Sequence, residues 1–376
     1  MKVGIDARFL THPQRGGFKT YTSSVVSSLV EAGSDCRFVL YTDRPLRQRA
    51  PLPANFSVSP VTGRNAVIRE QLLLPAVMER DEIDAAHFLC NTAPILFHRT
   101  MVVTIHDTIA LREKPDRSTC MNRRQRLLRS YWRAVIPRCA RRADLVITDS
   151  GYVRDDLHAR LGIPAEKLRV VPLPIDPAFS QESSGCPPAG IAPGSSFILA
   201  FASADGRKNH ATAIDAYDVV APEFPNLKLA LVCSHPQVRD GIKRPHDSGV
   251  IPVGPVSFQE LIWLYRNALA LVFPSFDEGF GLPPLEAMAC GTPVVVSKAG
   301  SLPEVAGDCA VFADPCDAAA VAEGLKLVLM DGDLRSGLVS AGREHAARFS
   351  RENVGRELIA AYSQAASGVP ASPAPA

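Results

Sequence analysis

The sequence predicts an α/β protein with two domains, each built around a parallel sheet of its own. Short runs rich in β-branched residues recur along the chain, and each is followed by a polar or glycine-containing turn and a segment with helical spacing. The chain has 376 residues, of which 46% are apolar and 21% charged, so it can bury more than one core. Residues 172–194, dense in Pro, Gly and Ser, divide the strand-like runs into two sets.

The expected strands are short, apolar and shared equally between the two halves. In the first half they are residues 3–5, 38–40, 85–89, 102–105, 145–147 and 170–171, and in the second half residues 197–201, 227–232, 250–251, 270–273, 294–296 and 311–312. Because each strand is followed by a segment with helical spacing, the pattern predicts βα units with parallel neighbouring strands. Each half is therefore expected to form a separate sheet.

These patterns divide the chain into five parts. The expected parts are an amino-terminal domain (1–174), a linker (175–195), a carboxyl-terminal domain (196–352), a final helix that packs on the body (353–366) and a disordered tail (367–376). The linker is predicted because a composition so rich in Pro, Gly and Ser is unsuited to a buried element. The final helix is predicted because Val354, Leu358 and Tyr362 share one helical face, and the tail because its composition is of low complexity.

Composition excludes several classes of protein. Apolar runs end well short of the roughly 20 residues that a membrane-spanning helix needs, so none is expected. The segment Met1–Asp6 predicts a first strand, not a secretory signal, because an acidic residue follows its short apolar run. Nine cysteines lie singly, without a C-x-x-C pair, which indicates reduced thiols and no zinc site. We therefore expect a cytoplasmic protein without a bound metal, and the net charge of +2 gives no indication of nucleic-acid binding.

The most informative motif is a pair of glutamates in the second half. Glu278 follows an expected strand, and Glu286, with seven residues between the two, lies in what the sequence predicts to be the first turn of the next helix. Ligands of open α/β sheets bind at the carboxyl ends of the strands. Gly279 and Gly281 leave room for a ligand near the backbone, and the prolines at 283–284 suit a helix start. The unpaired amides expected there suit a diphosphate.

The chemistry of these two carboxylates leaves two interpretations open. Glu286 can accept two hydrogen bonds from a ribose cis-diol, and Glu278 can bind hydroxyls of a sugar. Alternatively, Glu278 is a solvated loop residue and Glu286 is a favourable charge near a helix amino terminus. The residue types alone do not decide between a binding site and these structural roles.

The segment 273–293 resembles the E-x7-E signature of retaining glycosyltransferase family 4. The similarity continues through 297–307 and includes 257–265 upstream, and it is visible over most of the chain. The resemblance implies the GT-B fold, in which two Rossmann-like domains face each other across a cleft. It also implies that the first domain binds the acceptor and the second a nucleotide sugar.

The resemblance assigns roles to individual residues. It implies that Glu278 contacts the donor sugar and Glu286 the ribose. It further implies that the backbone amides of Phe280, Gly281 and Leu282 bind phosphate, as part of a donor site that includes Gly279.

Two cations are expected beside the same site. Arg207 and Lys208 follow an expected strand and resemble, with Asn209, the R-K-N pattern of the family. A basic pair in a loop is ordinarily solvated, but at this edge it can neutralise a diphosphate. The resemblance is incomplete, because Ala202 replaces a frequent glycine and Ser203 replaces a second arginine found in some members. We expect Lys208 to contribute more than Arg207.

In the first domain, His106 and Asp107 end an expected strand and resemble an H-D pair of the family. The resemblance implies that the imidazole faces the donor sugar, with Asp107 orienting the ring or the loop; alternatively His106 is a structural histidine held by a backbone hydrogen bond. Gly16 and Gly17 stand where the family has a glycine-rich loop before the first helix. They would let this loop approach phosphate or acceptor, although a plain turn explains them nearly as well.

The region 122–136 predicts a basic amphipathic helix. Such helices bind anionic membrane surfaces, which suits a lipid-linked acceptor, and we expect peripheral contact with the inner membrane face. The alternative, a helix packed on the core with a solvated basic face, is equally open.

Together these features predict a retaining, metal-independent hexosyltransferase that needs no cofactor. Helix amides, Lys208 and Arg207 would stabilise the leaving diphosphate without a metal. The resemblance to bacterial mannosyltransferases favours GDP-mannose as donor, while UDP-glucose and UDP-galactose remain open. The acceptor is expected to be a glycan or lipid-linked sugar in the assembly of O-antigen, capsule or exopolysaccharide.

Two alternative functions remain open. They are a sugar-nucleotide epimerase of similar architecture and a non-catalytic sugar-nucleotide-binding protein. An oxidoreductase is disfavoured because no G-x-G-x-x-G follows the first strand.

Overall fold

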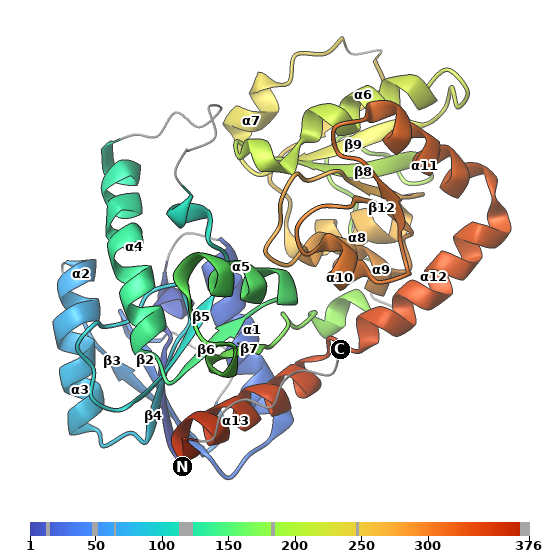
Figure 1. Cartoon of the computed structure of the whole chain (residues 1–376). Helices are drawn as coiled ribbons and strands as arrows, with labels where there is room; N and C mark the ends of the chain where they lie inside the picture. The colour runs from blue at the N-terminus through green and yellow to red at the C-terminus, as the bar shows by residue number, and fades with distance from the viewer. Residues whose placement is uncertain are drawn as a thin grey trace. The chain divides into compact units, whose positions relative to one another are not determined.

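The computed structural model describes residues 1–12, 16–46, 52–63, 65–112, 123–181, 185–245 and 248–368. These residues form two compact units (Figure 1). Unit 1 contains the described residues up to 174 together with 351–368, and unit 2 contains those from 175 to 350. The chain therefore returns to unit 1 after completing unit 2.

Unit 1 contains a parallel sheet of seven strands in the order β3-β2-β1-β4-β5-β6-β7. The strands are β1 (Lys2–Asp6), β2 (Arg37–Thr42), β3 (Phe56–Pro60), β4 (Ala85–Phe88), β5 (Thr100–Ile105), β6 (Leu145–Thr148) and β7 (Leu168–Val170). Its helices include α1 (Gly17–Ala32), α2 (Ala66–Ile68), α3 (Leu74–Arg80), α4 (Arg123–Arg142), α5 (Gly151–Leu161) and α13 (Arg351–Ser367), and a π-helical turn, η2 (Arg69–Leu73), joins α2 to α3.

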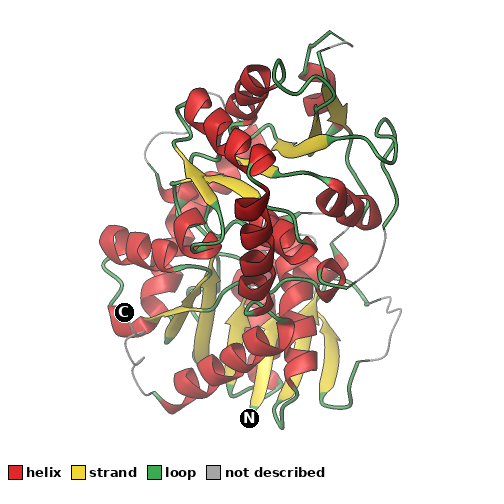
Figure 2. Cartoon of the chain, turned by 90° about the vertical axis from the view of Figure 1, so that its right-hand side faces the viewer, coloured by secondary structure: helices red, strands yellow, loops and turns green. Residues whose placement is uncertain are grey.

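Unit 2 contains a parallel sheet of six strands in the order β10-β9-β8-β11-β12-β13. The strands are β8 (Phe197–Ala202), β9 (Lys228–Cys233), β10 (Val250–Val253), β11 (Leu271–Phe273), β12 (Val294–Ser297) and β13 (Val311–Ala313). The helices are α6 (His210–Val220), α7 (Pro236–Gly241), α8 (Phe258–Asn267), α9 (Leu282–Cys290), α10 (Leu302–Ala306), α11 (Ala318–Met330) and α12 (Gly332–Ala347). Figure 2 shows strands with helices on their faces in each unit.

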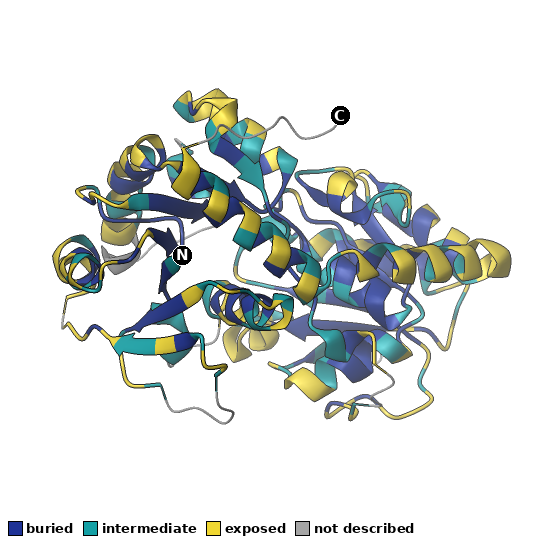
Figure 3. Cartoon of the chain, turned by 90° about the horizontal axis from the view of Figure 1, so that it is seen from below, coloured by how far each residue is buried: buried dark blue, intermediate teal, exposed yellow. Residues whose placement is uncertain are grey.

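The predicted α/β class and the two parallel sheets are confirmed. The strands are mostly buried and the helices alternate buried and exposed positions (Figure 3), as expected for sheets covered by amphipathic helices. The pattern did not predict β3, an edge strand in which only Phe56 is buried. An edge strand with one buried residue lacks the apolar run by which the others were identified.

The order of strands creates a switch point in each sheet. In unit 2 the chain runs from β8 to β9 and β10 on one side, and then from β11 to β13 on the other, so β8 and β11 are neighbours. In unit 1, β1 and β4 are neighbours for the same reason. Loops that leave the carboxyl ends of strands at such points diverge and leave room for ligands.

The segment 175–195, predicted to be a linker, belongs to unit 2. Ile175, Phe179 and Ile191 are buried, and the Phe179 ring lies 5.8 Å from that of Tyr265 on α8. A Cβ at Gly185 would lie 2.5 Å from the carbonyl oxygen of Gln259, so the chain passes directly over α8. Single apolar residues among the prolines therefore anchor this segment on unit 2, which the composition did not predict.

The last helix, α13, packs against α1 in unit 1. Val354, Leu358 and Tyr362 of α13 share a core with Val25 and Leu29 of α1. Of the predicted tail, residues 369–376 lie outside the described residues, as does Asn122 at the start of the predicted basic helix. In the described ranges, no helix combines the length and apolar character that crossing a membrane requires.

Candidate active site

The loops that follow β8 and β11 are in direct contact at the switch point of unit 2. The backbone N–H of Phe276 donates to the carbonyl oxygen of Arg207 at 2.8 Å. Beside this bond, Lys208 Nζ donates to Glu278 Oε1 at 2.7 Å, and Glu278 is only 8% exposed. The Lys208 ammonium also lies 5.2 Å from the centre of the Phe273 ring. The structure thus joins two predicted site residues that are 70 positions apart in the sequence.

The neighbouring cation, Arg207, has a different environment. Its Nε lies 3.1 Å from each carboxylate oxygen of Asp205. Burial opposes ionisation of Asp205, but the hydrogen bonds and charge of Arg207 outweigh it and lower the pKa of the Asp205 carboxyl. Much of the charge of Arg207 is therefore balanced within its own loop.

Asn209 holds the two loops together. Its backbone is left-handed, with φ of 49°, a conformation that asparagine tolerates better than most residues. Its Nδ2 donates to the carbonyl oxygens of Pro274 at 2.9 Å and Pro315 at 2.8 Å. The third residue of the R-K-N pattern therefore positions the loop that contains Glu278, a role the sequence did not reveal.

The backbone at Glu278 is supported by the turn before α10. Ser301 Oγ donates to the carbonyl oxygens of Glu278 at 3.0 Å and Phe280 at 2.7 Å. Gly300 has a φ of +60°, and a Cβ there would lie 2.7 Å from the backbone nitrogen of Glu278. Only glycine fits this close approach without displacing the glutamate.

The amino terminus of α9 exposes fewer amides than an ordinary helix start. Gly281 caps the helix with a φ of 106°, and a Cβ there would lie 2.6 Å from Leu302. The prolines at 283–284 have no N–H, so Leu282 supplies the only free donor of the first three helical positions. The N–H groups of Phe280, Gly281 and Leu282 have no acceptor among the described residues.

Glu286 lies in the second turn of α9, not in the first turn as the sequence predicted. The helix begins at Leu282, which makes Glu286 its fifth residue. Burial raises the pKa of Glu286 to about 7, the charge of Asp176 adds to the rise, and a hydrogen bond from the Tyr265 hydroxyl at 2.8 Å opposes it. This position excludes the alternative in which Glu286 serves as a first-turn charge.

In unit 1, His106 follows β5 at the carboxyl edge of the sheet. Its Nδ1 lies 2.6 Å from Asp149 Oδ2, its Nε2 lies 2.9 Å from the carbonyl oxygen of Leu89, and its backbone N–H donates to Asn91 Oδ1 at 2.8 Å. The Tyr21 ring stands edge-on to the imidazole, with ring centres 4.4 Å apart. Burial opposes protonation, but the charge and hydrogen bond of Asp149 raise the pKa of His106 well above its ordinary value.

The carboxylate that binds the His106 ring is thus Asp149, which the sequence analysis missed. Asp107 accepts a hydrogen bond from the backbone N–H of Ile109 at 2.9 Å, which places it against the turn η3 (Ile109–Leu111). A signal for Asp149 was present, since it directly follows β6, the neighbour of β5 in the sheet. The same strand-end argument that identified His106 applies to it.

Gly16 and Gly17 begin α1, with Gly16 as the capping residue. No heavy atom of the described residues lies within 4 Å of a Cβ built at either position, so packing among these residues does not require glycine there. The next residue, Phe18, has its ring centre 5.7 Å from that of His106. The start of α1 therefore lies at the same edge of the unit 1 sheet as His106; Gln14 and Arg15 lie outside the described residues.

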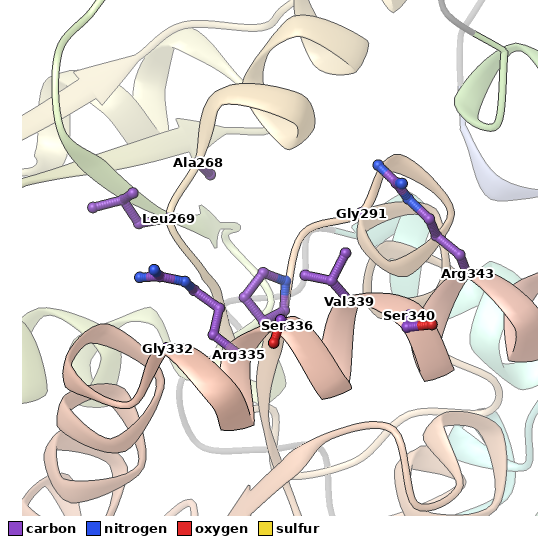
Figure 4. A pocket seen from close by; sticks show the side chains of 10 residues that line it. Ala268, Leu269, Gly291, Gly332, Arg335, Ser336, Val339, Ser340 and Arg343 are labelled. Atoms are coloured by element: carbon purple, nitrogen blue, oxygen red, sulfur yellow. The ribbon is translucent and has the colours of Figure 1, made fainter.

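A pocket of about 580 Å³ lies elsewhere in unit 2, among residues that precede β11 and β12 and residues of α12 (Figure 4). Its two cations are Arg335 and Arg343. Arg343 lies across Gly291, at the end of α9, where a positive charge stabilises the helix dipole. None of the predicted site residues lines this pocket.

Two family models match the chain in succession. The model described as "Glycosyltransferase Family 4" matches residues 15–179, and the model described as "Glycosyl transferases group 1" matches residues 187–345. Together they cover both units.

Individual relatives agree with these models. An O-antigen chain mannosyltransferase B of Escherichia coli is 30% identical over 58% of this chain and 60% of its own length. An MMP alpha-(1->4)-mannosyltransferase of Mycolicibacterium hassiacum is 30% identical over 72% of this chain and 67% of its own. The sucrose-phosphate synthase of Thermosynechococcus elongatus has a similar structure, with a TM-score of 0.67 at 19% identity, over 96% of this chain and 98% of that one. The chain therefore belongs to glycosyltransferase family 4 and has the GT-B fold.

Proposed function

We propose that the chain is a retaining glycosyltransferase that transfers mannose from a nucleotide diphosphate sugar to a glycan or lipid-linked acceptor during assembly of a bacterial surface polysaccharide. The observation that supports it most is the ion pair of Lys208 and Glu278 at the carboxyl edge of unit 2. It places a cation for phosphate beside a carboxylate for sugar hydroxyls, at the switch point where ligands of such sheets bind.

In this proposal Lys208 changes partner when the donor binds. Without donor, its ammonium neutralises the nearly buried Glu278. A diphosphate has the larger charge and would draw Lys208 away, which leaves the Glu278 carboxylate to accept hydrogen bonds from the sugar. As the bond to the sugar breaks, Lys208, Arg207 and the N–H groups of residues 280–282 stabilise the charge that develops on the leaving diphosphate.

Glu286 would bind the ribose of the donor. Its carboxylate can accept from both hydroxyls of a cis-diol, and the Tyr265 hydroxyl already fixes one of its oxygens. We also propose that Asp107, Gly16 and Gly17 take part in binding donor or acceptor, since they lie at the edge of the unit 1 sheet that contains His106.

The sugar and the nucleotide are inferred from relatives. Proteins named as mannosyltransferases, including the O-antigen enzymes of Escherichia coli and Salmonella typhimurium, match this chain at 27–30% identity. They support mannose as the sugar, and GDP-mannose as the donor is proposed from the family resemblance of the sequence. The proposal needs no metal, because the protein itself supplies the cations and amides that face the diphosphate.

A ligand screen followed by a transfer assay tests this function. We expect GDP and GDP-mannose to raise the Tm in the presence of a chelator, since a ligand that binds only the folded state stabilises it. GDP-mannose should then be consumed with an acceptor, and NMR of the product should show that the anomeric configuration of the donor is kept. A product of inverted configuration, or a chain that binds no nucleoside diphosphate, would contradict the proposal.

We further propose that unit 1 contacts an anionic membrane through α4 and the neighbouring turn η2. The side chains at 131–136 that were expected on the apolar side of α4 mostly pack on the core, which supports the structural interpretation for that part of the helix.

Nearer the start of α4, Leu127 and Leu128 are 67% and 46% exposed. Gln71 of η2 donates to the Tyr131 hydroxyl at 3.0 Å, which places exposed Leu72 in the neighbouring element. The sequence of α4 contains arginines and no acidic residue, which suits anionic lipid.

Liposome flotation tests this contact. We expect the protein to bind vesicles that contain phosphatidylglycerol at low salt, and Leu72→Ser with Leu127→Ser to reduce the bound fraction several-fold, because apolar burial adds to charge attraction. Leu327→Ser, at a 52% exposed leucine of unit 2, is the matched control and should leave binding unchanged. Equal binding of all three proteins, or no binding, would argue against this surface.

A further inference from the structure

The surroundings of the His106 ring specify its protonation state. Nε2 lies 2.9 Å from the carbonyl oxygen of Leu89, and a carbonyl oxygen can only accept, so Nε2 must carry a hydrogen. Nδ1 lies 2.6 Å from Asp149 Oδ2, a distance that requires one proton between the two atoms. Nε2 therefore carries one hydrogen, and a second proton lies between the His106 ring and the Asp149 carboxyl group.

The proton between them belongs on the ring. An imidazole is a stronger base than a carboxylate, with ordinary pKa values of about 6.5 and 3.9, and Asp149 is buried, so the imidazolium is the group that offsets its charge. The other titratable groups near the ring are Cys90 and Tyr21, whose pKa values are raised chiefly by burial, so both are uncharged at neutral pH. The upward pKa shift of His106 agrees with this arrangement.

A second buried histidine in the same unit provides a contrast. His87 Nδ1 lies 2.8 Å from the Tyr362 hydroxyl, and its Nε2 lies 2.7 Å from Thr104 Oγ1. Hydroxyls can donate or accept, so these contacts do not require a charge on the ring. Burial, together with the charge of His106, lowers the pKa of His87 to about 3. The two rings are thus expected to hold different numbers of protons at neutral pH.

We propose that Asp149 is a positioning residue, which together with the Leu89 carbonyl holds His106 as a permanent imidazolium at the carboxyl edge of the unit 1 sheet. The importance of this imidazolium for catalysis rests on the function proposed above. Since neither ring nitrogen has a free lone pair, His106 cannot take the proton of the acceptor hydroxyl. In the transfer, the bond between the anomeric carbon and the diphosphate oxygen breaks, the acceptor oxygen bonds to that carbon on the same face, and the acceptor proton passes to the departing diphosphate.

Nitrogen NMR of the ¹⁵N-histidine-labelled full chain tests the charge without any substrate. We expect His106 to show two protonated ring nitrogens at about pH 7, where an ordinary histidine with a pKa of about 6.5 is mostly neutral. His87, assigned with His87→Gln, should show one protonated and one unprotonated nitrogen, and His106→Gln assigns the other ring. An unprotonated nitrogen on His106 in the wild-type protein overturns the proposal, whatever the protein catalyses.

Asp149→Asn tests the positioning role. Loss of the carboxylate should lower the pKa of His106 below its ordinary value, since the main influence that opposes burial is then removed. Transfer by this variant should have a reduced kcat at neutral pH that rises again as the pH is lowered through the reduced pKa of His106, with KM for the donor nearly unchanged.

Asp144→Asn is the control, because Asp144 precedes β6 and accepts from the backbone N–H of Met101 at 2.8 Å, far along the strand from Asp149. It should behave as wild type. If Asp149→Asn keeps the wild-type kcat and pH profile, Asp149 does not position His106 for the reaction. If the wild-type protein itself transfers no sugar, the proposed function fails, while the NMR result still decides the charge of His106.

Discussion

Replacing Lys208 by alanine is expected to lower kcat by about 10²–10³-fold, the usual effect of removing one preorganised group that stabilises transition-state charge. Lys208 is the cation that contacts Glu278, and in our proposal it turns to the diphosphate when the donor binds. Steady-state kinetics with saturating donor measure the effect. Arg207→Ala should cost less, because Asp205 already balances much of that charge.

The same substitution leaves the nearly buried Glu278 without its partner, so a control must separate catalysis from loop disorder. The double variant Lys208→Ala with Glu278→Gln removes the uncompensated charge and should restore stability. The affinity for GDP is the readout, since in our proposal Glu278 contacts the sugar and not the diphosphate. If the double variant regains the wild-type affinity for GDP, our assignment of Lys208 to the diphosphate is wrong.

Nucleotide affinity is expected to depend on pH through Glu286. The pKa of this carboxyl is raised to about 7 in the unliganded protein, so it is mostly protonated at about pH 6 and mostly ionised at about pH 8. The ionised form accepts hydrogen bonds from both ribose hydroxyls, and the affinity for GDP should therefore weaken by up to about tenfold as the pH falls over that range. Isothermal titration calorimetry at several pH values measures this.

Variants at and beside Glu286 sharpen the test. Glu286→Ala should weaken GDP binding by about 10²-fold at high pH, since a hydrogen bond to a charged group contributes about 1.5–3 kcal/mol, and should abolish the pH dependence. Tyr265→Phe removes a hydrogen bond that favours the ionised form, so the midpoint should move to higher pH. Glu323→Gln, at an exposed glutamate of unit 2, should change neither the affinity for GDP nor its dependence on pH. An unaltered affinity in Glu286→Ala would remove the ribose role.

Much of the site could be predicted because one rule identifies it. Lys208, Glu278 and His106 each follow an apolar strand, and a parallel sheet brings such positions to the edge formed by the carboxyl ends of its strands. This rule applies to His106 in the unit 1 sheet and to the other two residues in the unit 2 sheet. The contact of Lys208 with Glu278 further depends on β8 and β11 being neighbours, which the sequence analysis did not predict. Local pattern therefore identified the residues, and strand order determined which of them meet.

Other features could not be predicted for definite physical reasons. Asp149 satisfies the same strand-end rule, but an acid after a strand is common, and its partner lies 43 residues away. The prediction that Glu286 lies in the first turn of its helix was wrong, and the residue lies in the second turn. The helix α9 begins at Leu282, ahead of the two prolines that suggested its start. Tyr265 acts on Glu286 from α8, a contact that depends on how two helices pack and not on either sequence alone.

The return of the chain to unit 1 affects the order in which the protein can fold as it is synthesised. Residues 351–367 supply the surface on which α1 rests, and Gly355 allows the closest approach, since a Cβ there would lie 2.1 Å from the Ser28 carbonyl oxygen. Chains emerge from the ribosome amino terminus first, at about 5–20 residues per second. The described residues of unit 2 all precede the return of the chain, so their packing does not depend on residues 351–367, whereas α1 stays uncovered until the last helix has been synthesised.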